Sequence, residues 1–337
     1  MNIGLIGCGG ISAAHLRSIA NLPGAKPVAF CDTVPERAYA HAAKFGGADA
    51  VVYSDYRELL ANPSVDVVHI MTPHFLHAEM SIAALRAGKY VLCEKPMAIR
   101  KDDAKAMIGA DTGGRLSIVF QNRYNPSTAK AKEIIDTHAL GKLLAISANV
   151  TWKRGAEYYA GSEWRGKWAA GGGGSLINQA IHTIDLMYYL GGPFERVKGS
   201  ISRDILRDVI EVEDNAHAVF LFQSGLTGLL HTSNNLGVDN PAQILLSFEG
   251  GTLDLHGGRL WLEQNNRITS IISDRPPQNG AKAEYGNSHQ TQIADMYRCI
   301  RENRRFWIDG MEAYPANWAV LSIYESSRDD AWISYDG

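Results

Sequence analysis

The sequence is poor in cysteine and has no long apolar segment. Only four cysteines occur among 337 residues, and they are far apart and never form a C-x-x-C pair. This spacing excludes a disulfide framework and a zinc ribbon, and it favours reduced thiols. No stretch approaches the roughly 18 uninterrupted apolar residues of a membrane span, and the start, Met1–Ile6, has no basic leader. We therefore expect a cytoplasmic protein that does not enter a membrane.

An excess of charge of either sign is also missing. Lys and Arg number 33 against 36 Asp and Glu, which leaves a formal net charge of -3. Such a balance argues against nucleic acid and anionic membranes as partners. Hydrophobic residues make up 45% of the chain and charged residues 20%, as in ordinary globular proteins. At about 150 residues per domain, the length suggests two domains.

Short apolar runs alternate with segments of helical period in the first third of the chain. The helical segments are long enough to cross back over a sheet, so the pattern predicts parallel strands in a doubly wound α/β domain over residues 1–121. The predicted strands are Asn2–Ile6, Lys26–Cys31, Val65–Met71, Tyr90–Glu94 and Leu116–Gln121; the predicted helices are Ile11–Leu22, Pro35–Phe45, Phe75–Ala87 and Lys101–Ala110.

Beyond residue 121 the predicted strands become longer and alternate apolar with polar residues. This pattern is typical of a mostly antiparallel sheet, and it predicts an α+β domain over residues 122–337 whose last helices can pack back on the first domain. The predicted strands are Lys142–Trp152, Phe194–Arg203, Asn215–Gln223, Leu226–Thr232 and Ala242–Phe248; helices are expected at Ala129–Thr137, at Gly174–Leu190 and twice near the end.

A glycine-rich turn follows the first predicted strand. Gly7, Gly9, Gly10 and Ile11 form a G-x-G-x-x-G pattern in which Ser12 takes the last place. The first glycine allows a tight turn, the second lets backbone N–H groups approach a pyrophosphate, and the third position needs only a small residue. Because the turn lies between a strand and a helix, it predicts a dinucleotide site.

Asp32 ends the second predicted strand, 20 residues after Ser12. A carboxylate at this place accepts hydrogen bonds from the adenosine ribose and repels a 2′-phosphate, which favours NAD. Arg37 lies five residues further on and could hold such a phosphate, so NADP stays open as a second cofactor.

Two further segments resemble a known family. They are Thr72-Pro73-His74-Phe75-Leu76-His77 with Gly88-Lys89-Tyr90-Val91-Leu92-Cys93-Glu94-Lys95-Pro96, and Gly172-Gly173-Gly174-Ser175-Leu176-Ile177-Asn178-Gln179-Ala180-Ile181-His182-Thr183-Ile184-Asp185. Together they resemble the glucose-fructose oxidoreductase / inositol dehydrogenase (Gfo/Idh/MocA) family, closest in motif to its nucleotide-sugar dehydrogenase branch. The resemblance implies an N-terminal Rossmann domain, hydride exchange at a hydroxyl carbon of a sugar, sugar derivative or cyclitol, and a homodimer or homotetramer paired through the large sheet.

The resemblance assigns catalysis to Lys95 and His182. An ammonium at the end of a strand can polarise the reacting oxygen, and a histidine can take or return its proton. Asn178 stands where many members carry aspartate; an amide can orient a hydroxyl but cannot act as a base. Asp185 lies three residues beyond His182 and could fix its tautomer.

The remaining site residues follow from the family pattern and from their charge. We expect Arg123, Tyr124, Lys153 and Asp185 to bind substrate with Asn178, and a further set to contact the cofactor with the glycine loop, Asp32, Arg37 and Lys95: Thr72, Pro73, His77, Glu94, Gln121, Trp164 and Arg165. His74 and His77 lack the H-E-x-x-H spacing of zinc proteases, so no metal site is predicted.

Two other functions stay open at this point. Some members of the family use NAD transiently to cleave glycosidic bonds, and a redox-silent dinucleotide-responsive binding protein would share the first domain. The presence of both Lys95 and His182 argues against the binding protein. Accumulation of reduced cofactor would separate the oxidoreductase from the glycoside-cleaving enzyme.

Overall fold

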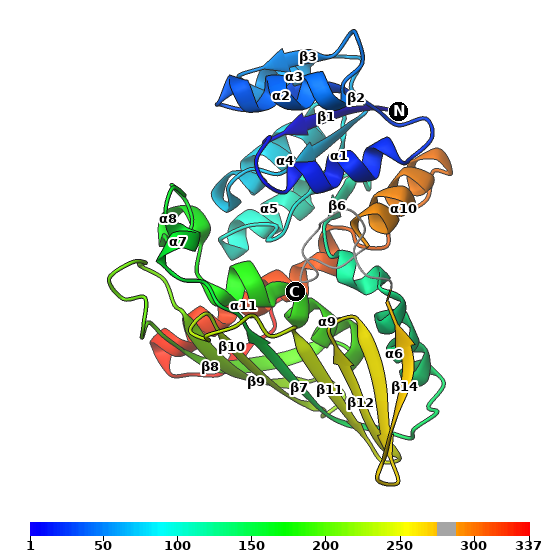
Figure 1. Ribbon diagram of the computed structural model, residues 1–337, viewed down its shortest axis with the longest axis vertical. Helices are drawn as coiled ribbons and strands as arrows, with labels where there is room; N and C mark the ends of the chain where they lie inside the picture. Colours follow the sequence, from blue (N-terminus) through cyan, green and yellow to red (C-terminus); the bar gives the residue numbers. More distant parts are fainter. Residues whose placement is uncertain (275–287) are drawn as a thin grey trace. The chain divides into compact units, whose positions relative to one another are not determined.

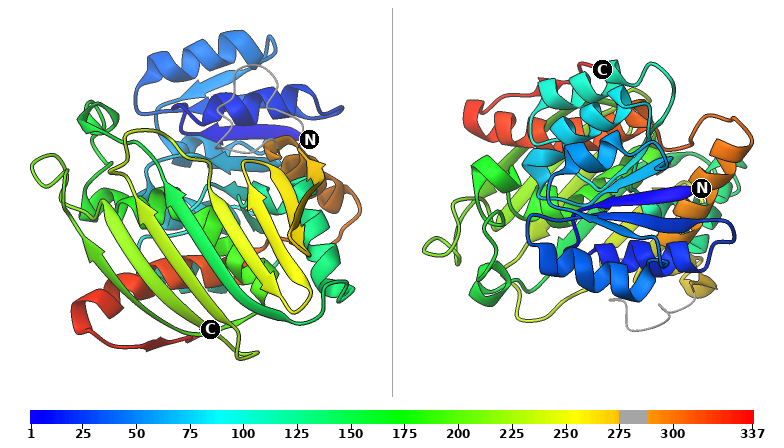
Figure 2. Two further views of the ribbon diagram at one scale, coloured as in Figure 1. Left: turned by 60° about the horizontal axis from the view of Figure 1, so that its bottom comes forward. Right: turned by 90° about the horizontal axis from the view of Figure 1, so that it is seen from above.

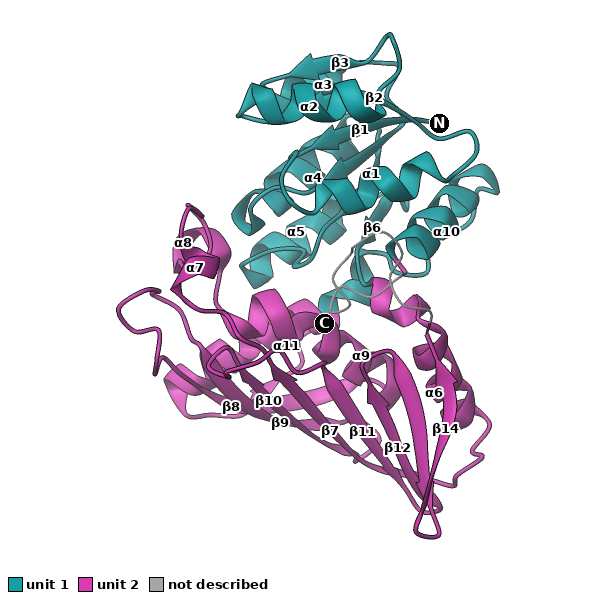
Figure 3. Cartoon of the chain, in the orientation of Figure 1, with its two compact units in different colours: residues 1–120, 289–314 teal, residues 121–288, 315–337 magenta. Residues whose placement is uncertain are grey.

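The computed structural model describes residues 1–274 and 288–337 (Figure 1). The chain forms two compact units, shown in different colours in Figure 3. Unit 1 comprises residues 1–120 and 289–314, and unit 2 comprises residues 121–288 and 315–337. Among the described helices, none is long and apolar enough to cross a membrane.

Unit 1 contains a six-stranded parallel sheet in the order β3-β2-β1-β4-β5-β6. The strand order reverses between β1 and β4, which is the topological switch point where such sheets bind ligands. This confirms the predicted doubly wound domain. The strands are β1 (Asn2–Ile6), β2 (Lys26–Cys31), β3 (Val51–Tyr53), β4 (Val67–Ile70), β5 (Tyr90–Cys93) and β6 (Leu116–Ile118).

Helices α1 to α5 each connect two successive strands of this sheet, whereas α10 comes from near the end of the chain. Helices α1 and α10 pack together, and α4 packs against α3 and α5. The helices are α1 (Ser12–Ala20), α2 (Pro35–Phe45), α3 (Tyr56–Ala61), α4 (His77–Arg86), α5 (Lys101–Ala110) and α10 (His289–Arg301), with a 3₁₀ turn at His74–Leu76.

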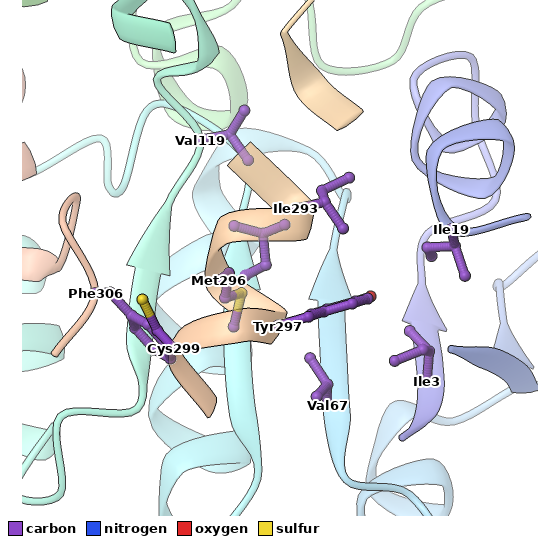
Figure 4. Close-up of a cluster of buried hydrophobic side chains, with 10 residues drawn as sticks. Ile3, Ile19, Val67, Val119, Ile293, Met296, Tyr297, Cys299 and Phe306 are labelled. Atoms are coloured by element: carbon purple, nitrogen blue, oxygen red, sulfur yellow. The ribbon is translucent and has the colours of Figure 1, made fainter. Parts of the chain in front are cut away.

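The core of unit 1 includes residues from both ends of the chain. Figure 4 shows Ile3 of β1, Ile19 of α1 and Val67 of β4 beside Ile293 and Tyr297 of α10. Gln292 of α10 donates to the Ile118 carbonyl and accepts from the Phe120 N–H, which ties α10 to the last strand. Helix α10 therefore completes the sheet packing of unit 1.

The sequence analysis missed β3 and α3. β3 is only three residues long and α3 only six, both too short for a periodic pattern to stand out. A usable signal was present at Asp55, whose carboxylate accepts the Arg57 N–H and caps α3.

Unit 2 contains a nine-stranded sheet in the order β14-β13-β12-β11-β7-β10-β9-β8-β15. The β7–β10 pair is parallel and the other pairs are antiparallel, which confirms the mostly antiparallel prediction. The strands are β7 (Leu143–Thr151), β8 (Phe194–Ser202), β9 (Asn215–Phe222), β10 (Thr227–Ser233), β11 (Gln243–Phe248), β12 (Gly251–His256), β13 (Arg259–Gln264), β14 (Arg267–Ser273) and β15 (Ile333–Ser334).

One face of this sheet is covered by helices, and the other is left bare by the residues of unit 2 that the structure describes (Figure 2). The alternation of β9 shows the reason, because Ala216, Ala218, Phe220 and Phe222 are buried while the residues between them are not. The helical segments of unit 2 are α6 (Pro126–Asp136), α7 (Ala156–Tyr159), α8 (Trp168–Gly171), α9 (Ile181–Gly191) and the part of α11 (Gly310–Asp329) from Pro315, with a 3₁₀ turn at Gln121–Tyr124.

The predicted regular helix over Gly174–Leu190 differs from the structure in its first turn. Leu176–Ala180 is π-helical, and the α-helix α9 begins only at Ile181. A π turn holds more residues than an α turn, so it shifts every later side chain around the helix axis. In a regular α-helix Asn178 and His182 would be related as i and i+4 on one face. This simple relation does not apply here, because Asn178 lies in the π turn.

Candidate active site

The loop between β1 and α1 leaves its backbone open to a ligand. Gly7 has φ = +93°, and a Cβ there would lie 2.6 Å from the Met71 carbonyl oxygen, so glycine is required. At Gly9 and Gly10, in contrast, a Cβ would meet no atom within 4 Å. Exposed backbone next to the N-terminus of α1 is the arrangement that binds phosphate groups.

Ser12, in the third glycine position, braces this loop. Its side chain is buried, and its hydroxyl donates to the Gly9 carbonyl at 2.5 Å. His41 Nε2 of α2 lies 2.8 Å from the same hydroxyl oxygen. Because the Ser12 hydrogen is used on Gly9, His41 acts as the donor. Serine thus meets the demand for a small residue and adds two hydrogen bonds.

Asp32 lies at the end of β2, directly beside the loop. Its carboxylate accepts the N–H groups of Cys8 at 2.8 Å and Val34 at 2.9 Å. The guanidinium of Arg37 lies 4.0 Å from Asp32 Oδ1, with 59% of the Arg37 side chain exposed. A fixed carboxylate and an exposed cation therefore occupy neighbouring positions at the end of β2.

His77, at the start of α4, joins two loops at the carboxyl ends of β4 and β5. Its Nδ1 lies 2.7 Å from the Pro96 carbonyl oxygen and its Nε2 lies 2.9 Å from the Thr72 carbonyl oxygen. Burial lowers the pKa of His77, so the neutral ring donates to one carbonyl at a time. Both ring nitrogens of His77 already lie next to backbone carbonyl oxygens, so a hydrogen bond to the cofactor would have to replace one of these contacts.

Glu94, Lys95 and Pro96 follow β5, and the Lys95–Pro96 peptide is cis. Glu94 is buried, and its Oε1 lies 3.0 Å from His15 Nε2 of α1 and 3.8 Å from His289 Nε2 of α10. Its other oxygen accepts the Lys95 N–H at 3.2 Å. The lysine is half-buried. A carboxylate is therefore held in place by the backbone of the expected catalytic lysine.

The polar helix segment of unit 2 begins at a crowded glycine run. A Cβ on Gly173 would lie 1.9 Å from the Tyr324 hydroxyl, and one on Gly174 would lie 1.9 Å from the Glu213 carbonyl oxygen. The buried Glu213 carboxylate accepts the N–H groups of Gly174 at 2.8 Å and Leu176 at 2.9 Å, and the Tyr324 hydroxyl at 3.0 Å. Burial raises the pKa of Glu213 to about 7, although these donors oppose the shift.

Asn178 lies in the π turn and is half-buried, like His182. Its amide nitrogen donates to the Tyr158 hydroxyl at 3.0 Å. The Arg165 guanidinium lies 4.8 Å from the centre of the Tyr158 ring and 5.1 Å from that of Trp164. The structure therefore brings together three residues that the sequence analysis had assigned separately to substrate and cofactor.

Arg123 and Asp185 are paired with each other. Arg123 Nε donates to Asp185 Oδ2 at 2.9 Å and Nη2 donates to Oδ1 at 2.7 Å, with each residue 1% exposed. Of the other expected substrate residues, Tyr124 is half-buried and Lys153 is exposed, with its N–H donating to Asp239. The expected cofactor residue Gln121 is buried.

Sequence reasoning missed a buried polar set in unit 1 formed by His15, His69, His289 and Tyr297. His15 lies among the buried residues of α1, and His69 lies in the buried strand β4. A histidine within an apolar stretch was the one sign in the sequence that a buried polar set exists. Within the described residues, one group has metal-ligand geometry: atoms of His15, Glu94 and His289 lie within 4.8 Å of one another.

Two family models match the chain. Residues 1–113 match "Oxidoreductase family, NAD-binding Rossmann fold", and residues 128–254 match "GFO/IDH/MocA C-terminal domain". A levoglucosan dehydrogenase of Pseudarthrobacter phenanthrenivorans is 31% identical over 391 aligned positions, which cover 99% of this chain and 97% of that protein.

Solved structures of related dehydrogenases align with this chain over its full length. A levoglucosan dehydrogenase in complex with NADH and levoglucosan aligns with a TM-score of 0.89 at 25% identity, covering 100% of both chains. The WlbA dehydrogenase from Bordetella pertussis, in complex with NADH and UDP-GlcNAcA, aligns with a TM-score of 0.86 at 31% identity, covering 100% of this chain and 99% of that one. With its glycine loop, its Glu94-Lys95-Pro96 segment and both matched domains, the chain belongs to the GFO/IDH/MocA family of NAD-binding oxidoreductases.

Proposed function

We propose that this NAD-dependent oxidoreductase transfers hydride between nicotinamide and a hydroxyl-bearing carbon of a sugar, a sugar derivative or a cyclitol. The observation that carries the proposal is the arrangement in unit 1, where Glu94 and Lys95 follow β5 in the same sheet as the glycine loop after β1. Ligands of such sheets bind at the carboxyl ends of the strands. The nicotinamide ring supplies the hydride acceptor.

Lys95 and His182 are the proposed catalytic residues. The Lys95 ammonium stabilises negative charge that develops on the reacting oxygen, and His182 takes the hydroxyl proton. Asn178 orients a substrate hydroxyl without exchanging protons, because an amide has no acidic or basic group in the ordinary pH range. Its amide nitrogen donates to the Tyr158 hydroxyl, which fixes the orientation of the amide.

Arg123 and Asp185 take a different role in this proposal from the substrate contacts expected at first. The two side chains satisfy each other in the interior of unit 2, and the pair joins the turn Gln121–Tyr124 to α9, which carries His182. We assign them to holding α9 in place. In unit 2, we assign contacts with substrate or cofactor to Lys153, Tyr124 and the Tyr158–Arg165 stack, together with Asn178.

A cofactor-reduction screen tests the proposal. Purified enzyme with NAD is offered aldoses, anhydrosugars, inositols and nucleotide-linked sugars while reduced nicotinamide fluorescence is followed. We expect reduction with one of these classes. Release of a sugar without net reduction would instead identify a glycoside-cleaving enzyme, and NAD binding without turnover on any class would favour a binding protein.

We further propose that the protein works in the cytoplasm as a homodimer or homotetramer paired through the bare face of the large sheet. Leu229 of β10 is 52% exposed there, whereas Leu230, which points to the helix-covered face, is buried. Apolar side chains on an uncovered sheet face are typical of a subunit interface. Light scattering of the eluting protein measures the mass, and Leu229→Glu should lower it.

A further inference from the structure

Four side chains of unit 1 form a continuous chain of hydrogen bonds that ends on Glu94. The Tyr297 hydroxyl lies 2.9 Å from His69 Nε2, His69 Nδ1 lies 2.8 Å from His15 Nδ1, and His15 Nε2 lies 3.0 Å from Glu94 Oε1. The residues come from α10, β4, α1 and the end of β5. None of the four is more than 8% exposed, so bulk water does not interrupt the chain.

The ionisation of each member follows from its surroundings. Burial raises the pKa of Tyr297 well above its ordinary value, so it keeps its hydrogen. Burial lowers the pKa of His15 and, more strongly, that of His69, so each ring carries one hydrogen. Burial alone would raise the pKa of Glu94, but the hydrogen bonds from the histidine side chains outweigh it and hold the pKa of the carboxyl well below its ordinary value.

These states leave one placement of hydrogens. An ionised Glu94 cannot donate, so His15 Nε2 donates to it. The neutral His15 then accepts at Nδ1, which makes His69 Nδ1 the donor. His69 in turn accepts at Nε2 from the Tyr297 hydroxyl. Every donor points toward the carboxylate. The reverse order, with Tyr297 accepting, would require a hydrogen on Glu94.

We infer that Tyr297 and His69 are positioning residues that lock Glu94 as a charged acceptor beside Lys95. This inference rests on the proposed roles of Glu94 at the cofactor and of Lys95 at the reacting oxygen. Tyr297 extends from α10 over Val67 toward Ile3 inside the apolar core (Figure 4), so the chain ends in the core. The chain of hydrogen bonds therefore acts as a fixed set of dipoles whose donors all point toward the Glu94 carboxylate.

The first experiment measures the hydrogens directly and does not depend on activity. Protein labelled with ¹⁵N-histidine is studied by long-range ¹H–¹⁵N correlation at pH 7, with His15 and His69 assigned through His15→Gln and His69→Gln. We expect neutral rings, with His15 in the Nε2–H form and His69 in the Nδ1–H form. A His69 ring in the Nε2–H form, or a charged ring at either position, would overturn the inference.

The second experiment asks whether the chain governs cofactor binding. Without the Tyr297 hydroxyl the chain can reverse, so Tyr297→Phe should raise the pKa of Glu94. Other titratable or charged groups near Glu94 are His15 from α1, His289 from α10, His77 from α4 and the adjacent Lys95. All of these are kept in the variant, so a change in the pH profile reports on the chain.

The measured quantity is the Kd for NADH between pH 5.5 and 8. We expect the wild-type value to change little and that of Tyr297→Phe to rise about threefold or more as the pH falls, since one pKa unit changes an ionised fraction by up to tenfold. The control is Tyr56→Phe, which removes a buried hydroxyl that donates to Glu79 in the same unit. It should match wild type.

Two results would refute the positioning role. One is a Tyr297→Phe profile parallel to wild type, because a merely structural loss weakens binding equally at every pH. The other is a stoichiometric metal ion in the purified protein, since a metal on His15 Nε2 would replace the hydrogen donated to Glu94. The substrate screen could fail while the histidine tautomers and the pH profile of the Kd for NADH come out as expected. That result would overturn the proposed function but not the positioning role of Tyr297 and His69.

Discussion

Arg123 and Asp185 form a two-pronged ion pair in the interior of unit 2, with donor–acceptor distances of 2.9 and 2.7 Å. The Arg123 guanidinium also lies 5.1 Å from the centre of the Tyr189 ring. Fixed parallel hydrogen bonds of this kind are strong and directional. Asp185 lies on α9 three residues after His182, so the pair anchors the same helix that carries the expected acid–base residue.

Breaking this pair should cost much of the stability of the protein. Asp185→Asn leaves a buried guanidinium without its counter-charge, which typically costs about 3–5 kcal/mol. Urea unfolding measures the loss. The exposed Asp103→Asn variant, next to Arg100 on the surface of α5, should unfold like wild type. An Asp185→Asn protein as stable as the control would show that the pair does not support α9.

The cofactor preference should depend on Asp32. A carboxylate fixed by the N–H groups of Cys8 and Val34 opposes a 2′-phosphate, so calorimetric titration should give tighter binding of NAD than of NADP. Asp32→Asn removes the negative charge, so it should reduce the difference between the affinities for NAD and NADP. Equal or tighter binding of NADP by wild type would mean that Arg37, not Asp32, determines the cofactor preference. In that case Arg37→Gln should restore tighter binding of NAD.

Removal of either proposed catalytic side chain should abolish most turnover. Lys95→Ala and His182→Ala should each lower kcat by about 10²- to 10⁴-fold, the usual contribution of an acid–base group. The Kd for NAD should change little, because both groups act on the substrate oxygen. His138→Asn, at an exposed histidine of unit 2, serves as the control. Wild-type turnover in either variant would remove that residue from the mechanism.

Glu213 should make stability depend on pH. Its folded-state pKa of about 7 lies above the ordinary 4.5, so the folded protein holds a proton that the unfolded chain has lost. The stabilising contribution is complete below about pH 4.5 and is lost as the pH rises through 7.

The comparison of wild type with Glu213→Gln isolates this effect. The buried histidines His15, His69 and His77, whose pKa values are lowered, act in the opposite sense and are present in both proteins. We expect the wild type to lose stability relative to Glu213→Gln between pH 5 and 8, measured by urea midpoint. A constant difference across this range would contradict the assignment.

Local patterns were sufficient to predict the parallel sheet and the loop at Gly7–Ser12. The bounds of β1 and β2 agree with the prediction because a run of apolar residues ends in each case at a glycine or an acidic residue. The π turn at Leu176–Ala180 could not be predicted in this way. Glu213 holds the N–H of Leu176, where the turn begins, and that of Gly174 just before it, from 37 and 39 positions away. A periodic pattern contains no information on such a partner.

The same limit applies to the candidate site. Lys95 and His182 lie in recognisable motifs, but Asp185 is paired with Arg123 from 62 positions earlier, and the neighbours of Glu94 come from α1 and α10. Histidines in apolar stretches were the one local sign of this buried set. The identity of their partners depends on tertiary packing.

The place of α10 in unit 1 has a consequence for synthesis of the protein. Residues 1–120 leave the ribosome first, but Ile293, Met296 and Tyr297, which complete their core, follow only after residues 121–288. At about 5–20 residues per second the unfinished sheet waits roughly ten to thirty seconds. During this time its apolar face is open to chaperones, and Glu94 has no tyrosine at the end of its hydrogen-bond chain. A chain that stops before α10 is therefore expected to be recognised as incomplete and degraded.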